Sequence, residues 1–180
     1  AVAVPGKALS LEWMASPVME NCEGPSVEGI AWHDPAFPAL DWAPIKLPDA
    51  NGIPGDKAAD RFYRTVFAAR RGQAVVLEWR SDDGSWVYLN GKLLIHQGGD
   101  CHQSGCVNGR CGNGVGVGGY VDLTPDLVEG PNVLAIHVSN GGCCGSFFDA
   151  KLLPDLQIVP VDWRGSEVSE YCEGPNDNGR

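Results

Sequence analysis

Cysteine is the residue type whose placement in this sequence points most directly to chemistry. Five of the seven cysteines lie in two glycine-rich stretches, Cys101, Cys106 and Cys111 in one and the adjacent Cys143 and Cys144 in the other. Such loop cysteines would be exposed reactive thiols in a reducing cytosol, whereas outside the cell they form disulfides. The cysteines therefore predict disulfide bonds and a secreted, extracellular or cell-surface protein.

Metal binding is the alternative chemistry for the same residues. Cys101, Cys106 and Cys111, together with His96 or His102, supply the sulfur and nitrogen ligands that zinc prefers. Four residues separate successive cysteines, which is wider than the two-residue spacing of a zinc knuckle, so disulfides are the favoured interpretation. Because seven is an odd number, one thiol is free or pairs with another chain.

A short repeat suggests one particular disulfide. Cys-Glu-Gly-Pro occurs at residues 22–25 and again at residues 172–175. Chance is one explanation. The other is that Cys22 and Cys172 pair and clasp the terminal segments, because chain ends often lie close together in a domain.

The composition excludes several classes of partner. The chain has 180 residues with 13 basic and 23 acidic side chains, and its net charge is −10. Nucleic acid and anionic lipid are bound through clusters of Lys and Arg, so neither is an expected partner. No run of about 18 apolar residues occurs, so membrane insertion is not expected. The sequence begins at Ala1 without Met or a basic leader, which is typical of a mature or trimmed chain.

Motifs for catalysis are missing from the sequence. It contains no Gly-x-Ser-x-Gly elbow, no His-Glu-x-x-His pair and no Walker loop. Glycoside cleavage needs two carboxylates that flank the scissile bond, and no pair of acidic residues stands out. We therefore expect a non-catalytic protein.

The elements that must position these residues are β-strands. Residues 1–60 are rich in proline and predict an irregular wrap, residues 61–162 predict a strand core, and residues 163–180 predict a tail. Asn90-Gly91 predicts a tight hairpin, because both turn positions need a positive φ. The predicted strands are 61–69, 73–80, 86–89, 92–95, 132–139, 147–153 and 156–161.

These short strands predict the fold class. No stretch shows a 3.6-residue period over more than two turns, so residues 1–180 are expected to form a single all-β domain, an antiparallel β-sandwich. Residues 98–119 are rich in glycine and predict a long loop. A loop of this length inside a compact domain is usually functional or disordered.

Three segments in order carry a resemblance to a known family. They are WAPIKLP at 42–48 followed by RFYRTVF at 61–67, SDDGSWVYLNGK at 81–92 running on to HQGG at 96–99, and DLTPDL at 122–127 followed by EGPNVLAI at 129–136. The set resembles the sugar-binding jelly-roll domain of β-galactosidase-type glycoside hydrolases, within the galactose-binding-like superfamily. The resemblance implies a jelly roll that binds carbohydrate, whereas catalysis in those enzymes belongs to a separate barrel domain.

A second resemblance concerns the middle segment. Ser-Asp-Asp-Gly-Ser-Trp before an Asn-Gly hairpin is similar to the sandwich of protective-antigen-type and yeast-flocculin adhesins. In the lectins among them, adjacent aspartates and a later asparagine hold a calcium ion that meets the sugar. This resemblance implies calcium ligands at Asp82, Asp83 and Asn140, all of which supply hard oxygen atoms. The alternative is that Asp82-Asp83-Gly84 is only a turn between strands.

Other polar and aromatic residues are candidates for the ligand site. Residues 49–56, with Asp149, are a second candidate for calcium. Sugar binding needs an aromatic platform and planar polar groups, although most of the six tryptophans should lie in the core. His137 lies within a predicted strand and is expected to be a strand residue and not a ligand. The candidates for sugar contacts are Trp32, His33, His96, Asp100, His102 and Asn140.

The sequence thus predicts a secreted, non-catalytic, lectin-like domain that binds carbohydrate, with calcium as its candidate cofactor. Two alternatives stay open. One is a structural or adhesive extracellular protein that binds another protein through its odd cysteine. The other is the non-catalytic module of a larger glycoside hydrolase.

Overall fold

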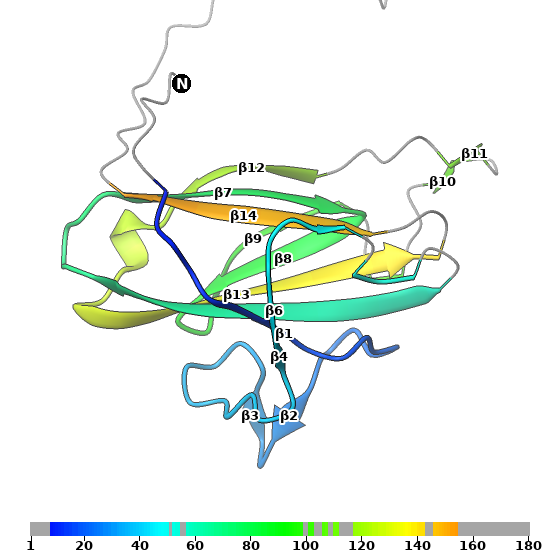
Figure 1. Cartoon of the computed structure of the whole chain (residues 1–180), viewed down its shortest axis with the longest axis horizontal. Helices are drawn as coiled ribbons and strands as arrows, with labels where there is room; N and C mark the ends of the chain where they lie inside the picture. The colour runs from blue at the N-terminus through cyan, green and yellow to red at the C-terminus, as the bar shows by residue number, and fades with distance from the viewer. Residues whose placement is uncertain are drawn as a thin grey trace, which may run out of the picture.

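The structure is a computed structural model. It describes residues 8–50, 52–54, 57–98, 101–102, 117–142 and 146–154, and the backbone of residues 106–107 and 110–111. Within these residues two antiparallel sheets lie face to face (Figure 1), which confirms the predicted all-β sandwich. The helical content of the described part is one 3-10 turn, η1 (Thr124–Asp126), and no helix there is long and apolar enough to cross a membrane.

The larger sheet has six strands and the smaller has four. The order in the larger sheet is β4 (Ala43–Ile45), β1 (Trp13–Ala15), β6 (Ala58–Ala69), β13 (Gly130–Gly141), β8 (Gly84–Leu89) and β9 (Lys92–Gln97). The order in the smaller sheet is β12 (Val117–Asp122), β7 (Val75–Asp82), β14 (Phe147–Pro154) and β5 (Asp49–Ala50). Two minor hairpins pair β2 (Ser26–Val27) with β3 (Ile30–Ala31), and β10 (Cys106–Val107) with β11 (Arg110–Cys111).

The hydrophobic core lies between the two sheets. Because side chains of a strand alternate between its faces, every second residue of β6, β7 and β13 points inward. Tyr63, Leu77 and Ile136 are fully buried in this way, and Phe148 of β14 contacts Trp13 and Tyr63 edge-on or tilted at ring distances of 5.6 and 4.2 Å. Burial of these large apolar surfaces is the main stabilisation of the sandwich.

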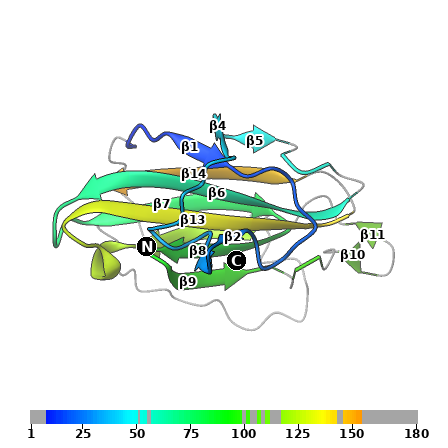
Figure 2. The same ribbon diagram turned by 90° about the horizontal axis from the view of Figure 1, so that it is seen from below.

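A second apolar cluster lies on the opposite, outer face of the six-stranded sheet. We call the segment between β1 and β4, which carries β2 and β3, the covering segment. It lies over this face (Figures 1 and 2) and buries Trp32 against Phe62 of β6 and Ala135 of β13. The guanidinium of Arg64 fastens the segment, because it donates hydrogen bonds to the carbonyls of Trp32 and Asp34 at 2.7 and 2.8 Å. β13 is therefore buried on both faces.

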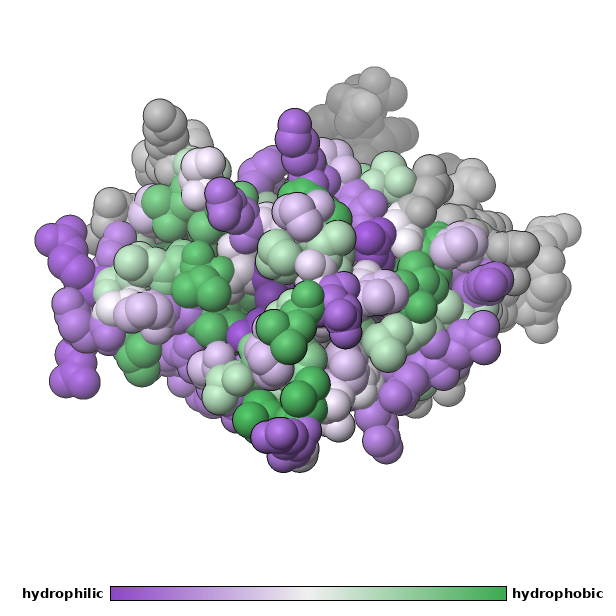
Figure 3. All heavy atoms as spheres, turned by 60° about the horizontal axis from the view of Figure 1, so that its bottom comes forward, coloured by the Kyte–Doolittle hydropathy of each residue, from purple (hydrophilic) through white to green (hydrophobic). Residues whose placement is uncertain are grey.

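The surface of this covering segment mixes apolar and polar side chains. Figure 3 shows apolar and hydrophilic residues interleaved on this face. Leu40 is 85% exposed and is the most exposed large apolar residue of the described part. Single exposed apolar residues of this kind are normal on soluble domains and indicate no binding site by themselves.

The strand predictions are largely confirmed. Six predicted strands are present as β6, β7, β8, β9, β13 and β14, and the seventh, 156–161, lies outside the described residues. The Asn90-Gly91 turn joins β8 and β9 with φ of 51° and 84° at its two positions, as predicted. Two features differ from the prediction: β1 to β5 occur within residues 1–60, and β12 occurs at the end of the glycine-rich stretch.

Candidate functional site

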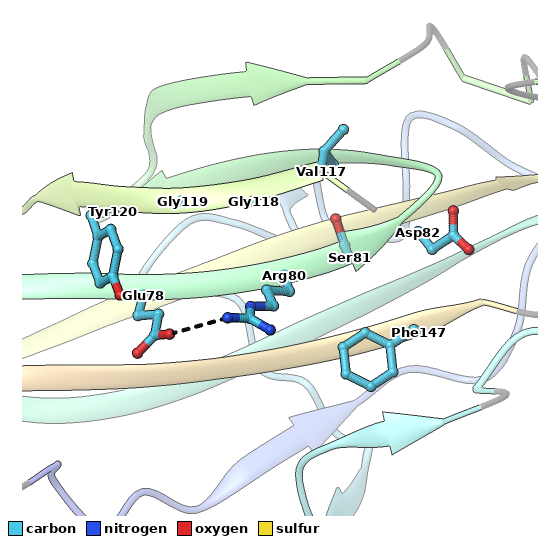
Figure 4. A pocket seen from close by; sticks show the side chains of 9 residues that line it. All are labelled: Glu78, Arg80, Ser81, Asp82, Val117, Gly118, Gly119, Tyr120 and Phe147. Carbon is cyan, nitrogen blue, oxygen red and sulfur yellow. Dashed lines mark ion pairs between the residues drawn. The ribbon is translucent and has the colours of Figure 1, made fainter. Parts of the chain in front are cut away.

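A pocket of about 530 Å³ opens on the outer face of the four-stranded sheet (Figure 4). Leu77 and Trp79 of β7 are buried in the core, so the alternate residues Glu78, Arg80 and Asp82 point outward. All three outward residues line the pocket. β7 thus contributes a row of charged groups to one continuous surface.

The neighbouring strands place an aromatic side chain at each end of this row. Tyr120 of β12 lies opposite Glu78 in the ladder, and Phe147 of β14 lies opposite Asp82. Between them Gly118 lies opposite Arg80, so the position beside the guanidinium has no side chain. Gly118 and both rings line the pocket (Figure 4).

Glycine is required at position 118 by the close approach of β12 to β7. A Cβ there would lie 2.3 Å from the carbonyl oxygen of Trp79, a distance that real Cβ atoms do not show. Any other residue would therefore push β12 away from β7.

The side chains around the pocket are accessible to a ligand. Tyr120 is 54% exposed and the side chain of Arg80 is 73% exposed. The nearest carboxylate oxygen of Glu78 is 3.9 Å from the Arg80 guanidinium, which is a weak and solvent-screened contact. Ser81, which also lines the pocket, has a buried hydroxyl with no hydrogen-bond partner among the described residues.

Asp82 lies at the Phe147 end of the pocket, next to Asp83 and joined to it by a cis peptide bond. Burial raises the pKa of Asp82 to about 6, and the hydrogen bond and like charge of Asp83 add to this shift. Its Oδ1 is buried and has no hydrogen-bond partner among the described residues. A buried carboxylate oxygen without a donor is costly, and a bound cation would satisfy it. The pair therefore fits a hard cation such as calcium.

Asp83 has a different role from its neighbour. Its Oδ2 accepts a hydrogen bond from the Gly141 amide at 2.9 Å, and its own amide donates to the Ser139 carbonyl at 3.2 Å. Asn140 lies between these contacts, and its amide nitrogen donates to the carbonyls of Pro54 and Lys57. The structure thus brings Asp83 against the end of β13. In Asn140 the side-chain oxygen is the atom able to bind a cation.

In the second candidate calcium site, residues 49–56 with Asp149, the described carboxylates contact basic or hydroxyl groups. Asp49 Oδ2 accepts hydrogen bonds from Arg61 at 2.8 Å and from the Tyr63 hydroxyl at 3.0 Å. Asp149 lies 3.8 Å from the Lys151 ammonium, and Asp56 lies outside the described residues. Asp49 therefore belongs to a structural ion pair that fastens β5 beside β6.

The expectation that Trp32 is an exposed sugar platform is wrong. Trp32 is 2% exposed and packs on Phe62 and Tyr88 at ring distances of 4.8 and 5.2 Å. The proline-rich segment around it is irregular, but it covers a sheet face instead of extending into solvent. His33 is half-buried and stacks on Tyr88 at 4.3 Å.

The other predicted sugar contacts that the structure describes do not line the pocket. His96 is exposed on β9 and stacks on Trp86 at 4.3 Å. Trp86 in turn stacks on His137, and His137 on Phe62, so four rings from four adjacent strands form one ladder. Asp100 lies outside the described residues. None of the described members of the predicted set lines the pocket between Tyr120 and Phe147.

His102 and His137 meet at a buried carboxylate that sequence patterns did not single out. Asp60 of β6 is fully buried, and its two oxygens each lie 2.7 Å from a histidine Nε2, Oδ1 from His137 and Oδ2 from His102. Burial raises the pKa of this carboxyl, but the hydrogen bonds and charge of the histidines outweigh burial and lower it overall. Asp60 is therefore ionised and accepts from both rings. Burial lowers the pKa of His137.

The disulfide next to Asp60 corrects one sequence prediction. Cys22 pairs with Cys101, and not with Cys172, which lies outside the described residues. Cys106 and Cys111 are partners in the backbone ladder of β10 and β11. Cys143 and Cys144 lie outside the described residues. The observed bridge joins the covering segment to residue 101, a pairing across 79 residues that spacing alone does not reveal.

Comparisons with known proteins address the fold. A scan against models of protein families finds no match, and a search of curated proteins finds none. Among solved structures, β-glucuronidase 2 of Bacteroides uniformis, solved bound to cyclophellitol-6-carboxylate aziridine, matches over 85% of this chain with a TM-score of 0.54 and 18% identity. The chain shares the fold of a β-sandwich domain of family 2 glycoside hydrolases.

Two further structures agree with this assignment of fold. A β-glucuronidase of glycoside hydrolase family 2 matches over 84% of this chain with a TM-score of 0.52 and 16% identity. A family 2 member from Bacteroides cellulosilyticus matches over 83% with a TM-score of 0.50 and 16% identity. The chain covers 18 to 20% of the length of these three proteins. The resemblance predicted from the sequence is thus confirmed for the fold.

Proposed function

We propose that this chain is a non-catalytic carbohydrate-binding module and that the pocket between Tyr120 and Phe147 binds the sugar. The observation that carries the proposal is the arrangement of the pocket. Two aromatic side chains lie at its ends, and an exposed guanidinium and two carboxylates lie between them. The fold shared with family 2 glycoside hydrolases supports the same class of ligand.

The chemistry of a sugar ring matches this arrangement. A pyranose has an apolar face of C–H groups, which packs on an aromatic ring, and a rim of hydroxyls, which need donors and acceptors. The Arg80 guanidinium presents several N–H donors in one plane, and carboxylates such as Glu78 accept from adjacent hydroxyls. Tyr120 is the better platform of the two rings because more than half of it is exposed.

Calcium is the cofactor that we propose for the Asp82 end of the pocket. The support is the buried Oδ1 of Asp82 without a donor and the second carboxylate beside it. Calcium binds carboxylate and carbonyl oxygens and accepts sugar hydroxyls as further ligands. Asp82, Asp83 and the side-chain oxygen of Asn140 are the groups that would hold it.

The module would work as part of a larger, secreted enzyme. The chain covers about a fifth of the family 2 hydrolases that it resembles, so we infer that it serves as a binding module of a larger glycoside hydrolase. The Cys22–Cys101 disulfide supports a secreted protein, because such bridges persist in oxidising compartments.

A glycan array tests the proposal, read once with calcium and once with a chelator of divalent ions. Binding that the chelator removes supports both the sugar site and the cofactor. Binding that the chelator leaves intact supports the sugar site and refutes the role of calcium. Failure to bind any glycan in either condition, with the protein folded by circular dichroism, refutes the proposed function.

A further inference from the structure

Four potential metal ligands converge beside β6, and none of them lines the pocket. They are the sulfurs of Cys22 and Cys101, the Nε2 of His102 and a carboxylate oxygen of Asp60, and these atoms all lie within 4.8 Å of one another. The Cys101 sulfur lies 3.3 Å from Asp60 Oδ1, and His102 Nε2 lies 2.7 Å from Oδ2. Among the described residues this is the one group of three or more such side chains close enough to share an ion.

The types of these ligands select the metal. Thiolate sulfur and imidazole nitrogen suit zinc, and four protein ligands with no open position are typical of a structural zinc site. In a tetrahedral site with Zn–S bonds of about 2.3 Å, the two sulfurs lie roughly 3.8 Å apart. The two cysteines must therefore be reduced before they bind, and their sulfurs must separate by side-chain rotation.

The surroundings of Asp60 resemble those of a metal ligand. His137 is buried and donates to Asp60 Oδ1, so it fixes the orientation of the carboxylate, as outer partners of metal ligands do. Ser139 positions the ligand His102, because the Ser139 hydroxyl accepts a hydrogen bond from the His102 amide at 3.1 Å. Cys22, Cys101 and His102 are each partly exposed, so an ion can reach the group from solvent.

We propose that Cys22, Cys101, His102 and Asp60 form a zinc site. The site cannot bind zinc while Cys22 and Cys101 are joined as a disulfide, and it binds zinc once they are reduced. A dithiol reductant gives two electrons and two protons to the disulfide and itself becomes a disulfide, which leaves two protein thiols. Zinc then binds both sulfurs and displaces the two thiol protons to solvent. Residue 22 of the covering segment is joined to residue 101 by the disulfide in the oxidised state and by the shared zinc ion in the reduced state. The segment therefore stays fixed after reduction.

Zinc binding is measured on the whole chain, oxidised or reduced with a phosphine. The phosphine takes oxygen from one water molecule, and the two water protons pass to the thiols. Reduced protein should retain one zinc per chain after desalting, and oxidised protein should retain none at this site. Cobalt in place of zinc should give the visible absorption of a tetrahedral thiolate complex.

Variants distinguish this group from other cysteines. Cys22→Ser and His102→Ala should abolish stoichiometric zinc binding, whereas Cys106→Ser, a cysteine outside the group, should retain it. His137→Gln should weaken zinc binding by about 10- to 100-fold without removing the cobalt spectrum, because His137 orients a ligand and binds no metal itself.

The opposite pattern refutes the site. Loss of zinc in Cys106→Ser with retention in Cys22→Ser would place the metal on a different set of cysteines that includes Cys106. Retention of zinc by the oxidised protein, with the disulfide verified by mass spectrometry, would also contradict the proposal. Near-UV circular dichroism of each variant establishes that a lost site does not reflect an unfolded chain.

Discussion

Asp83 joins the end of β7 to the end of β13, because its Oδ2 accepts a hydrogen bond from the Gly141 amide at 2.9 Å. Its neighbour Asp82 has a buried Oδ1 without a partner among the described residues. Asp83 therefore fastens the end of β13 through one of its oxygens, and the buried oxygen of Asp82 is placed for a ligand. The two residues should respond differently to mutation.

Asp82→Asn should remove the response to calcium without lowering stability in its absence. Burial chiefly raises the pKa of Asp82 to about 6, so above that pH the folded protein carries a buried charge at a cost that asparagine does not have. At pH 7.5 in a chelator, the melting temperature of the variant should equal or exceed that of the wild type. Added calcium should raise the melting temperature of the wild type only.

Asp41→Asn is the matched control, since Asp41 is exposed and the charge change is the same. This variant should respond to calcium like the wild type. A calcium response retained by Asp82→Asn, or a fall of several degrees in chelator, would contradict the assignment of Asp82 as a ligand.

Gly24→Ala should destabilise the covering segment strongly. A Cβ at Gly24 would lie 2.4 Å from Trp32 Cδ1 and 2.7 Å from Phe62 Cε1, and the φ of 75° disfavours any side chain. Backbone strain and overpacking together should cost about 2–4 kcal/mol. For a chain of this size the melting temperature should fall by roughly 5–12 °C, measured by calorimetry.

Gly29→Ala separates the two causes. Gly29 has a similar φ of 81°, but nothing lies within 4 Å of its Cβ position. This variant should lose only the backbone contribution, about 1 kcal/mol. Equal losses for the two variants would show that Trp32 is not packed against Gly24.

His33 should make the protein less stable as the pH falls. Burial lowers its pKa below the ordinary value of 6.5, so the unfolded chain takes up a proton more readily than the folded one. The stability that His33 contributes is full above pH 6.5 and is lost as the pH falls through that value. Asp34, Arg64 and the Gly91 backbone also act on this ring, and Tyr88 stacks on it.

His33→Phe keeps the stack on Tyr88 and cannot take up a proton. Between pH 7.5 and 5.5 the free energy of unfolding, from denaturant titrations, should fall less for this variant than for the wild type. Above pH 7.5 the two curves should run parallel. Identical slopes at all pH values would contradict the burial of His33.

Local sequence signals predicted the strands better than the site. Asn90-Gly91 identified its hairpin because the turn needs a positive φ at both positions, a property of the residues themselves. β12 was missed because Gly118 and Gly119 remove the alternation that marks a strand. The role of Tyr120 follows from its exposed place on β12, which its residue type alone does not show.

The remaining differences come from contacts distant in sequence. Trp32 lies in a proline-rich stretch whose sequence predicts an irregular, exposed segment. Only its packing on β6 and β13 buries it. Asp60 carries no local motif, and its neighbours Cys22, Cys101 and His137 come from three separate segments. Such convergence depends on the strand order, which the sequence pattern leaves undetermined.

The most direct test of the sugar site is the affinity of Tyr120 variants for a glycan that the array identifies. Calorimetric titration should show that Tyr120→Ala binds at least about ten-fold more weakly, because the aromatic platform is lost. Tyr120→Phe should retain most of the affinity, and Leu93→Ala, at an exposed apolar position of the other sheet, should match the wild type. Wild-type affinity in a folded Tyr120→Ala variant would contradict the placement of the sugar in this pocket.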